Sequence, residues 1–298
     1  MTQVTKTRLL VLTTVALLLA PLLSIEPRTY LTLSVAGLAM GMLIFLVASG
    51  LTLIFGLMDV LNFAHGALFS WGAFVGFSIA VSLDRRFHWA TSGSVGANLL
   101  ILLLALTATV LVTAALGLLL ERVIVRPVYG QHLFQILITL GATIVLEELI
   151  RIVWGPNDQV MPVPLTLQGS WDVADVVVLR FPVVAIGLGL LVYAGMRLVL
   201  NRTRVGLIVR AGVENGEMVQ VMGHNLSRYF TGVFAAGSGL AGVGGLGSVT
   251  GSLVGALLVG LSYNYVAFLL PKAAIGVNMA LMVLILLLRP TGLFGAGK

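Results

Sequence analysis

The stretch that decides the fold is NLLILLLALTATVLVTAALGLLL, residues 98–120, which contains no charged side chain. An α-helix needs about 20 apolar residues to cross the hydrocarbon core of a bilayer, so this run is long enough to span one. Comparable runs follow one another along the chain, at residues 9–25, 30–57, 60–83, 98–120, 133–154, 181–200, 229–270 and 274–288. We therefore predict an all-α fold, a polytopic transmembrane helical bundle with about eight hydrophobic segments.

The composition agrees with a protein embedded in membrane lipid. Hydrophobic residues make up 59% of the 298 residues and charged residues only 9%, against about 45–50% and about 25% in soluble domains. The net charge of +6 comes from basic residues spread over short loops, which argues against one basic patch and a nucleic-acid partner. The chain has no cysteine, so it offers no disulfide and no thiolate, and we expect neither a metal nor a cofactor.

The distribution of lysine and arginine predicts the orientation of the spans. Basic residues in short loops favour the cytoplasm. This rule places the amino terminus and the arginine-rich segment 201–228 inside, and the acidic loop 155–180 outside. The first run, 9–25, has the shape of a signal peptide, but we interpret it as a retained first span because further spans follow at once.

The longest apolar run, residues 229–270, exceeds a single crossing. It is also crowded with glycine, which lets helix backbones approach closely in lipid. We predict that this run is broken or doubled.

Segment 201–228 is the most informative soluble part of the chain. Its pattern predicts two short helices, 205–213 and 217–222, separated by Asn215 and Gly216. One side of this segment is apolar, with Leu207, Ile208, Val219 and Met222. Such an element suits docking into the groove of a partner. The alternative is a solvated surface helix, and the residues alone leave both open.

Two polar side chains, Asn62 and His65, fall within the run 60–83. At a spacing of i, i+3 they would share one face of a helix. Polar groups inside a membrane are costly unless they face a cavity or pair with another helix. The pair therefore either lines a pathway or joins two helices by hydrogen bonds.

A second charged group lies in the run 133–154, towards its outer end. Glu147, Glu148 and Arg151 are spaced so that they can pair with one another. The alternative is that the carboxylates recognise the ammonium group of a substrate.

Several stretches, in order along most of the chain, share a pattern with one known family. They are ASGLTLIFGLMDVLNFAHGALFSWGAF at 48–74, LERVIVRPV at 120–128, GPN at 155–157, TRVGLIVRAGVENGEMVQVMGHNLSRYFTGVFAAGSGLAG at 203–242, GGLGSVTGSLVGALLVG at 244–260 and RPTGLFG at 289–295. Together they resemble the permeases of branched-chain amino acid ABC importers. So many matches in order are far more specific than a single glycine motif.

The resemblance implies an importer of the bacterial inner membrane for branched-chain or related small amino acids. A periplasmic substrate-binding protein would deliver the substrate, this chain and a second permease subunit would form the path, and two ATP-binding subunits would drive transport. ATP hydrolysis would lie on those partner subunits, and this chain indeed has no phosphate-loop motif. Residues 1–298 would form a single permease domain, with 201–228 as its cytoplasmic coupling loop.

The resemblance also marks residues for these roles. It supports a substrate pathway at Asn62, His65 and Gly66. It implies a contact with the ATP-binding subunits at Gly206, Arg210, Ala211, Glu214, Gly216, Gly223 and Asn225. Within that set, Arg210 and Glu214 are spaced i, i+4 and can form an ion pair, and we expect Gly216 to act as a hinge.

The chain departs from the family at one place. In the family, an outer loop and another crossing separate the segments that match 230–242 and 244–260, whereas here Gly242 runs almost directly into Gly244. Two full crossings within 229–270 would leave the basic carboxyl-terminal tail outside, against the charge rule. We therefore expect one half of this run to be a re-entrant or half-length helix.

Two other classes of protein are alternatives. A secondary transporter or channel for small polar solutes would need a coupling-ion site or pore charges within its spans, and deep charges are nearly absent. A membrane-embedded hydrolase would use Ser238 as nucleophile and His65 as base.

Overall fold

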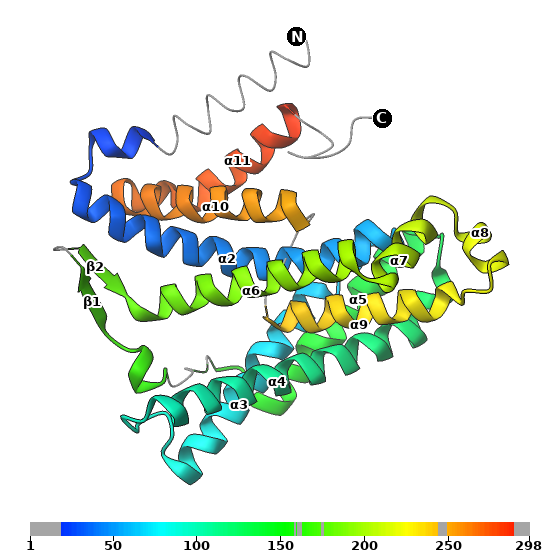
Figure 1. The fold of residues 1–298 in the computed structure, drawn as a ribbon, viewed down its shortest axis with the longest axis horizontal. Coiled ribbons are helices and arrows are strands. Elements are labelled where there is room, and N and C mark those ends of the chain that lie inside the picture. The colour runs from blue at the N-terminus through cyan, green and yellow to red at the C-terminus, as the bar shows by residue number, and fades with distance from the viewer. Residues whose placement is uncertain (1–18, 158, 160–162, 174–175, 244–248, 289–298) are drawn as a thin grey trace. The chain divides into compact units, whose positions relative to one another are not determined.

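The computed structural model describes residues 19–157, 159, 163–173, 176–243 and 249–288 (Figure 1). Within these ranges four helices are long and apolar enough to cross a membrane. They are Pro27–Met58, His65–Phe87, Val95–Val128 and Arg180–Arg202. The prediction of a helical membrane protein is confirmed.

The helices follow the apolar runs closely. Their order is α2 (Pro27–Met58), α3 (His65–Phe87), α4 (Val95–Leu120), α5 (His132–Trp154), α6 (Arg180–Arg202), α7 (Arg204–Glu214), α8 (Gly216–Val221), α9 (Leu226–Val243), α10 (Val249–Leu269) and α11 (Ala274–Leu288). Short helical turns add η1 (Ala20–Leu23), η2 (Glu121–Val125), η3 (Arg126–Val128), η4 (Leu165–Leu167) and η5 (Pro271–Ala273). Most of the run 9–25 lies outside the described residues.

The long run 229–270 forms two helices, α9 and α10, so the prediction that it is broken or doubled is confirmed. The helices are 18 and 21 residues long, which corresponds to about 27 and about 31 Å at 1.5 Å per residue. Neither is a half-length helix, and that part of the expectation is wrong. Neither α9 nor α10 is among the four helices of the described residues that are long and apolar enough to cross a membrane.

The connection between α5 and α6 contains two short strands that the sequence did not predict. Strands β1 (Ser170–Val173) and β2 (Val176–Leu179) pair antiparallel, with Trp171 opposite Val178. Consecutive β-branched valines in β2 favour an extended backbone. The pattern of β2, half-buried and exposed residues in alternation, is typical of a strand with one covered face.

The chain divides into two compact units. One holds Leu46–Gln168 and Leu191–Val249, and the other holds the described residues of Met1–Phe45, Gly169–Leu190 and Thr250–Lys298. In the second of these, α10 packs on the first half of α2. There a Cβ atom at Gly41 would lie 2.8 Å from Leu257 Cα, and the Ser34 hydroxyl lies 2.8 Å from the Tyr265 hydroxyl.

In the unit 46–168 and 191–249, α9 packs against α3 and α4 (Figure 1). Small residues bring the backbones together, since a Cβ atom at Gly72 of α3 would lie 2.5 Å from Gly242 Cα of α9. On α4, a Cβ atom at Gly117 would overlap Ser238 of α9. Phe234, fully buried, fills the core beside these contacts. Close packing through small residues is how helices associate in lipid, where apolar surface is covered in any case.

Candidate coupling and transport sites

Helices α7 and α8 form a hairpin between the spans α6 and α9, as the sequence predicted (Figure 1). Each helix that starts in this region is capped by a side-chain oxygen. Thr203 accepts a hydrogen bond from Gly206 N at 3.3 Å, Asn215 from Met218 N at 3.0 Å, and Asn225 from Arg228 N at 3.2 Å. Such caps satisfy donors that the helix itself leaves free, and each contributes about 1 kcal/mol. Asn225, expected to contact a partner, therefore has a clear structural role at the start of α9.

The inner side of the hairpin packs on its own unit. Val209 of α7 is 1% exposed and joins a core cluster with Leu53, Met196 and Val233. Gly212 lies against Leu226, since a Cβ atom there would overlap the leucine side chain. This packing fixes how α7 sits on the spans.

The outer side of the hairpin is apolar and exposed. Leu207 is 62% exposed, Val221 84% and Met222 70%. The apolar side predicted from the sequence is therefore split: Val219 is buried and Ile208 half-buried, while Leu207 and Met222 face outward. The hairpin both holds to its spans and presents apolar side chains away from them.

One expectation for the hairpin is wrong, and the hinge expected at Gly216 stays a prediction. Among the ion pairs of the described residues, none joins Arg210 to Glu214, and the Arg210 Nε–H instead donates to the Gly206 carbonyl at 3.3 Å. Gly216 is the first residue of α8, lies 3.0 Å from Leu226 Cδ2 through a notional Cβ, and is not among the described glycines with a positive φ. The backbone leaves the helical conformation at Asn215 (φ −153°, ψ 89°), so a break lies between α7 and α8, and Gly223 after α8 adopts a left-handed conformation with φ +86°.

The remaining residues of the predicted coupling set sort by burial. Gly206 is buried against the end of α6, and Ala211 is half-buried. Glu214 is exposed at the last position of α7. Of these three, Glu214 is the one available to a partner.

The expected pathway residues lie where α2 gives way to α3. Helix α3 begins at His65, so Asn62 precedes it and the two do not share a helix face as predicted. Asn62 instead folds the chain into the helix: its Oδ1 accepts from Ala64 N at 3.1 Å and its carbonyl from His65 N at 3.3 Å. Asparagine is well suited to such local bonds, which compete with a continuous helix. Gly66 is exposed, with no atom within 4 Å of a notional Cβ.

Asn62 and His65 are nevertheless both buried, each 3% exposed. His65 Nε2 lies 3.3 Å from the Val47 carbonyl of α2, so this side chain joins two helices. Asn62 Nδ2 and His65 Nδ1 have no hydrogen-bond partner in the described part of the protein. Each residue therefore combines a structural bond with an unused polar atom.

The irregular backbone at 59–64 is held by two residues of α5 that the sequence analysis missed. The Leu61 N–H donates to Gln135 Oε1 at 3.4 Å, and the Phe63 N–H donates to Thr139 Oγ1 at 3.2 Å. Gln135 Nε2 also donates to the Val128 carbonyl at 3.2 Å. Backbone that leaves the helix in a membrane protein needs such partners. The signal in the sequence was an i, i+4 pair of polar residues within an apolar run.

A second missed element is the turn that ends α4. The π-helical turn η2 begins at Glu121, which is fully buried and accepts a hydrogen bond from the Tyr129 hydroxyl at 2.8 Å. Burial, and then the hydrogen bond to Glu121, raises the pKa of Tyr129 above its ordinary value, so the phenol keeps its proton. Turns of this type are uncommon and often mark functional positions.

The charged residues near the ends of α5 form surface pairs. Arg151 Nη1 lies 3.2 Å from Glu148 Oε2, which agrees with local pairing, and both side chains are exposed. At the other end, His132 Nε2 lies 3.6 Å from Asp59 Oδ2.

The geometry contradicts a hydrolase. The Ser238 hydroxyl is buried without a hydrogen-bond partner among the described residues and lies against Gly117. His65 Nε2 faces the Val47 carbonyl, and His65 Nδ1 likewise forms no hydrogen bond with Ser238. A nucleophilic serine needs a base within hydrogen-bond reach, and this pair does not meet.

The sequence profile of the family described as branched-chain amino acid transport system, permease component, matches residues 33–246. The chain belongs to this family. It is a transport subunit and not itself an ATPase. The matched range covers α3 to α9 entirely, and with them the junction at 59–64 and the α7–α8 hairpin of the permease.

Curated relatives match over nearly their whole length. The permease is 28% identical to the high-affinity branched-chain amino acid transport system permease protein BraD of Pseudomonas aeruginosa, over 89% of this chain and 96% of BraD. It is 25% identical to the permease protein LivH of Escherichia coli K12 and of Salmonella typhimurium, over 87% of this chain and 93% of each relative. No solved structure matches the chain significantly.

The alignment with BraD also bears on the expected missing segment. The alignment has 301 positions but includes only 89% of the 298 residues of this chain, so some of its positions are gaps in this chain. Part of BraD therefore has no counterpart in the permease, and a segment missing between Gly242 and Gly244 stays a prediction.

Proposed function

We propose that the permease and a second permease subunit together form the translocation path of an ATP-driven importer for branched-chain or related small amino acids. The importer lies in the bacterial inner membrane, and a periplasmic binding protein delivers the substrate. Family membership and the names of BraD and LivH support this class of cargo. A secondary carrier is disfavoured because Glu148 and Arg151 of α5 pair with each other at the surface instead of forming an ion site within the spans.

The observation that carries the proposal is the exposed apolar side of the α7–α8 hairpin. Residues 201–228 act as the coupling loop, and Leu207, Val221 and Met222 seat in a groove of the ATP-binding subunit. Burying a large apolar side chain gains about 1.5–3 kcal/mol, so three of them supply a firm contact. Hydrolysis in a separate subunit can move the permease only through a contact that differs between two states.

The substrate path is proposed to pass the junction between α2 and α3. Asn62 and His65 carry unused polar atoms there, and the exposed Gly66 leaves room beside them. His65→Leu should lower uptake, because an apolar side chain supplies neither the bond to Val47 nor a free ring nitrogen. Wild-type uptake by a variant with both Asn62 and His65 made apolar would remove this junction from the path.

The topology is also a proposal. The hairpin and the amino terminus face the cytoplasm, the chain has about eight hydrophobic segments, and one of α9 and α10 is re-entrant, which keeps the basic tail inside. With the hairpin inside, this arrangement puts Lys272 on the outer side. A cysteine at Lys272 should react with an impermeant reagent added to intact cells, and protection there would show that α9 and α10 both cross.

The partner contact is tested by cross-linking in the assembled transporter. A cysteine at Val221 should cross-link to the ATP-binding subunit, and a cysteine at Leu191, 70% exposed on the span α6, serves as the matched control. Equal cross-linking from both positions, or none from Val221, would contradict the assignment of the hairpin.

A further inference from the structure

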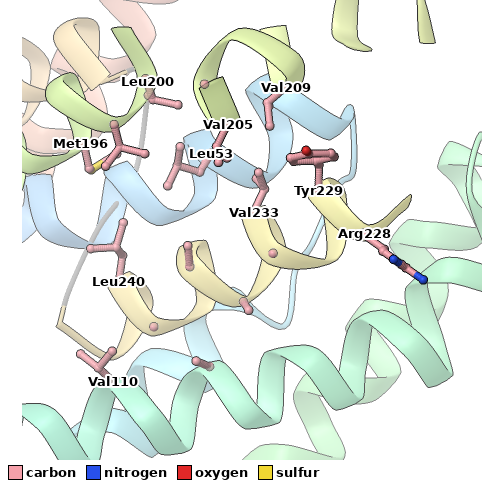
Figure 2. Close-up of a pocket in the computed structure, with 17 residues that line it drawn as sticks. Leu53, Val110, Met196, Leu200, Val205, Val209, Arg228, Tyr229, Val233 and Leu240 are labelled. Atoms are coloured by element: carbon pink, nitrogen blue, oxygen red, sulfur yellow. The ribbon is translucent and has the colours of Figure 1, made fainter. Parts of the chain in front are cut away.

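A pocket of about 610 Å³ lies within the unit 46–168 and 191–249, between α7, α9 and the neighbouring spans (Figure 2). Leu53, Met196, Val205, Val209, Val233 and Leu240 are among its lining residues and come from α2, α6, α7 and α9. Nearly every other lining residue is also aliphatic or glycine, and Arg228 is the one charged member. This composition is that of a site for an apolar molecule of substantial size.

The lining excludes the amino acid that the permease is proposed to transport. A zwitterion needs a partner for its ammonium group as well as for its carboxylate. None of the described lining residues is acidic, and besides Arg228 only Tyr229 contributes a side-chain nitrogen or oxygen. The pocket is therefore distinct from a substrate path.

The long dimension of the pocket matches one leaflet of a bilayer. Along α9 it runs from Arg228 to Leu240, which is about 18 Å at 1.5 Å per residue. Half of the hydrocarbon core of a bilayer is about 15 Å. An acyl chain that starts at the membrane surface would run the length of this pocket.

The charged end lies where a lipid headgroup would sit. Arg228 is in the first turn of α9, and Figure 2 shows its side chain reaching outward, away from Leu240 and Val110 at the other end. It is exposed, and no acidic side chain pairs with it among the described residues. Arg202 and Arg204 flank the lining residues Leu200 and Val205 in the sequence, so positive charge gathers at this end. Arginine and tyrosine at the interface favour anionic headgroups.

We propose that this pocket binds an anionic phospholipid, with an acyl chain along α9 and the phosphate at Arg228. The lipid would fill the space between α7 and α9. Because Val205, Gly206 and Val209 of α7 line the pocket, a bound lipid stabilises the position of the α7–α8 hairpin against the spans. The site depends on membrane embedding alone and not on the identity of the cargo.

The test uses the full-length permease, with the subunits that copurify, in phosphatidylcholine vesicles containing a trace of phosphatidylglycerol with a photoreactive acyl chain. Irradiation should label peptides of α7 and α9. Unlabelled phosphatidylglycerol should compete better than unlabelled phosphatidylcholine. Labelling confined to other surfaces, or equal competition by the two lipids, would overturn the proposal. The proposal would also fail if a second subunit filled the pocket with its own side chain and so prevented labelling.

Two variants with matched controls separate the headgroup from the acyl chain. Arg228→Gln should lower labelling about fivefold, since one basic residue near a membrane surface contributes about that factor, whereas Arg197→Gln on α6 should not. Gly232 lines the pocket and has no atom within 4 Å of a notional Cβ. A leucine side chain at this position would therefore occupy the pocket, and Gly232→Leu should abolish labelling there. Gly195→Leu, equally unobstructed but outside the lining, should leave labelling unchanged. Loss of labelling in both controls would show nonspecific disturbance and contradict the site.

Discussion

Replacing Gly206 by alanine should dislodge the coupling hairpin. A Cβ atom at Gly206 would overlap the Leu200 carbonyl oxygen and lie 2.6 Å from both Leu200 Cα and its carbonyl carbon, where ordinary contact begins at 3.4 Å. The start of α7 must therefore move from the end of α6 by at least about 0.8 Å. Backbone atoms, unlike the tip of a long side chain, cannot rotate away.

The cost of such overpacking is about 1–3 kcal/mol. If this cost falls on the packing of α7 against α6, the equilibrium constant for the native position of the hairpin decreases by about 5- to 150-fold. Membrane insertion should persist, because Gly206 lies outside the spans. Transport should fall at least about fivefold, and substrate should no longer stimulate ATP hydrolysis in the assembled complex.

The measurement compares uptake and ATPase stimulation in vesicles for Gly206→Ala and for Gly195→Ala. Gly195 is an exposed helical glycine of α6 whose notional Cβ meets no atom within 4 Å, so alanine there should be neutral or slightly stabilising. Wild-type uptake and ATPase stimulation by Gly206→Ala would refute the reasoning. Equal loss in both variants would also refute it, because the effect would then not depend on the contact with Leu200.

Three other perturbations test the sites around the hairpin. Gln135→Leu should lower the free energy of unfolding by about 1–3 kcal/mol, because the Leu61 N–H and the Val128 carbonyl lose their buried partner. Thermal unfolding in detergent measures this change, and a change within error would contradict the role given to α5. Tyr129→Phe removes the hydrogen bond to the buried Glu121 and should destabilise by a similar amount in the same assay, with an unchanged melting temperature as the opposing result. A cysteine at Asn215 should resist an impermeant reagent in intact cells and react in inside-out vesicles, and ready labelling from outside would reverse the topology.

The sequence predicted the helices well because apolar length and glycine breaks leave few alternatives in a membrane. It located the α7–α8 hairpin from two short periodic segments and the Asn215-Gly216 step between them. The break between the two helices lies at Asn215, directly before Gly216, whereas the left-handed conformation of Gly223 is visible only in the backbone. Spacing permits an Arg210–Glu214 pair, but the nearby Gly206 carbonyl receives the guanidinium instead.

The sequence pointed to Asn62 because of an assumed helix face, but in the structure Asn62 precedes the helix. Periodicity predicted a helix through Asn62, whereas its side chain bonds locally and ends the irregular segment before α3. The partners Gln135 and Thr139 lie more than 70 positions further along the chain. A contact between such distant segments depends on how α5 packs, which no local pattern encodes. The β-hairpin at Ser170–Leu179 was missed for a related reason, since four-residue strands leave only a short signal.

We infer that this permease moves amino acids only as part of an ATP-driven complex. The direct measurement is uptake of radiolabelled leucine into vesicles that contain the permease with its copurifying subunits and the binding protein, with and without ATP inside the compartment that the hairpin faces. Uptake should require ATP and the ATP-binding subunits, and it should decrease when Val221 is replaced by aspartate. Leucine uptake by the permease alone, driven by an ion gradient without ATP, would contradict it.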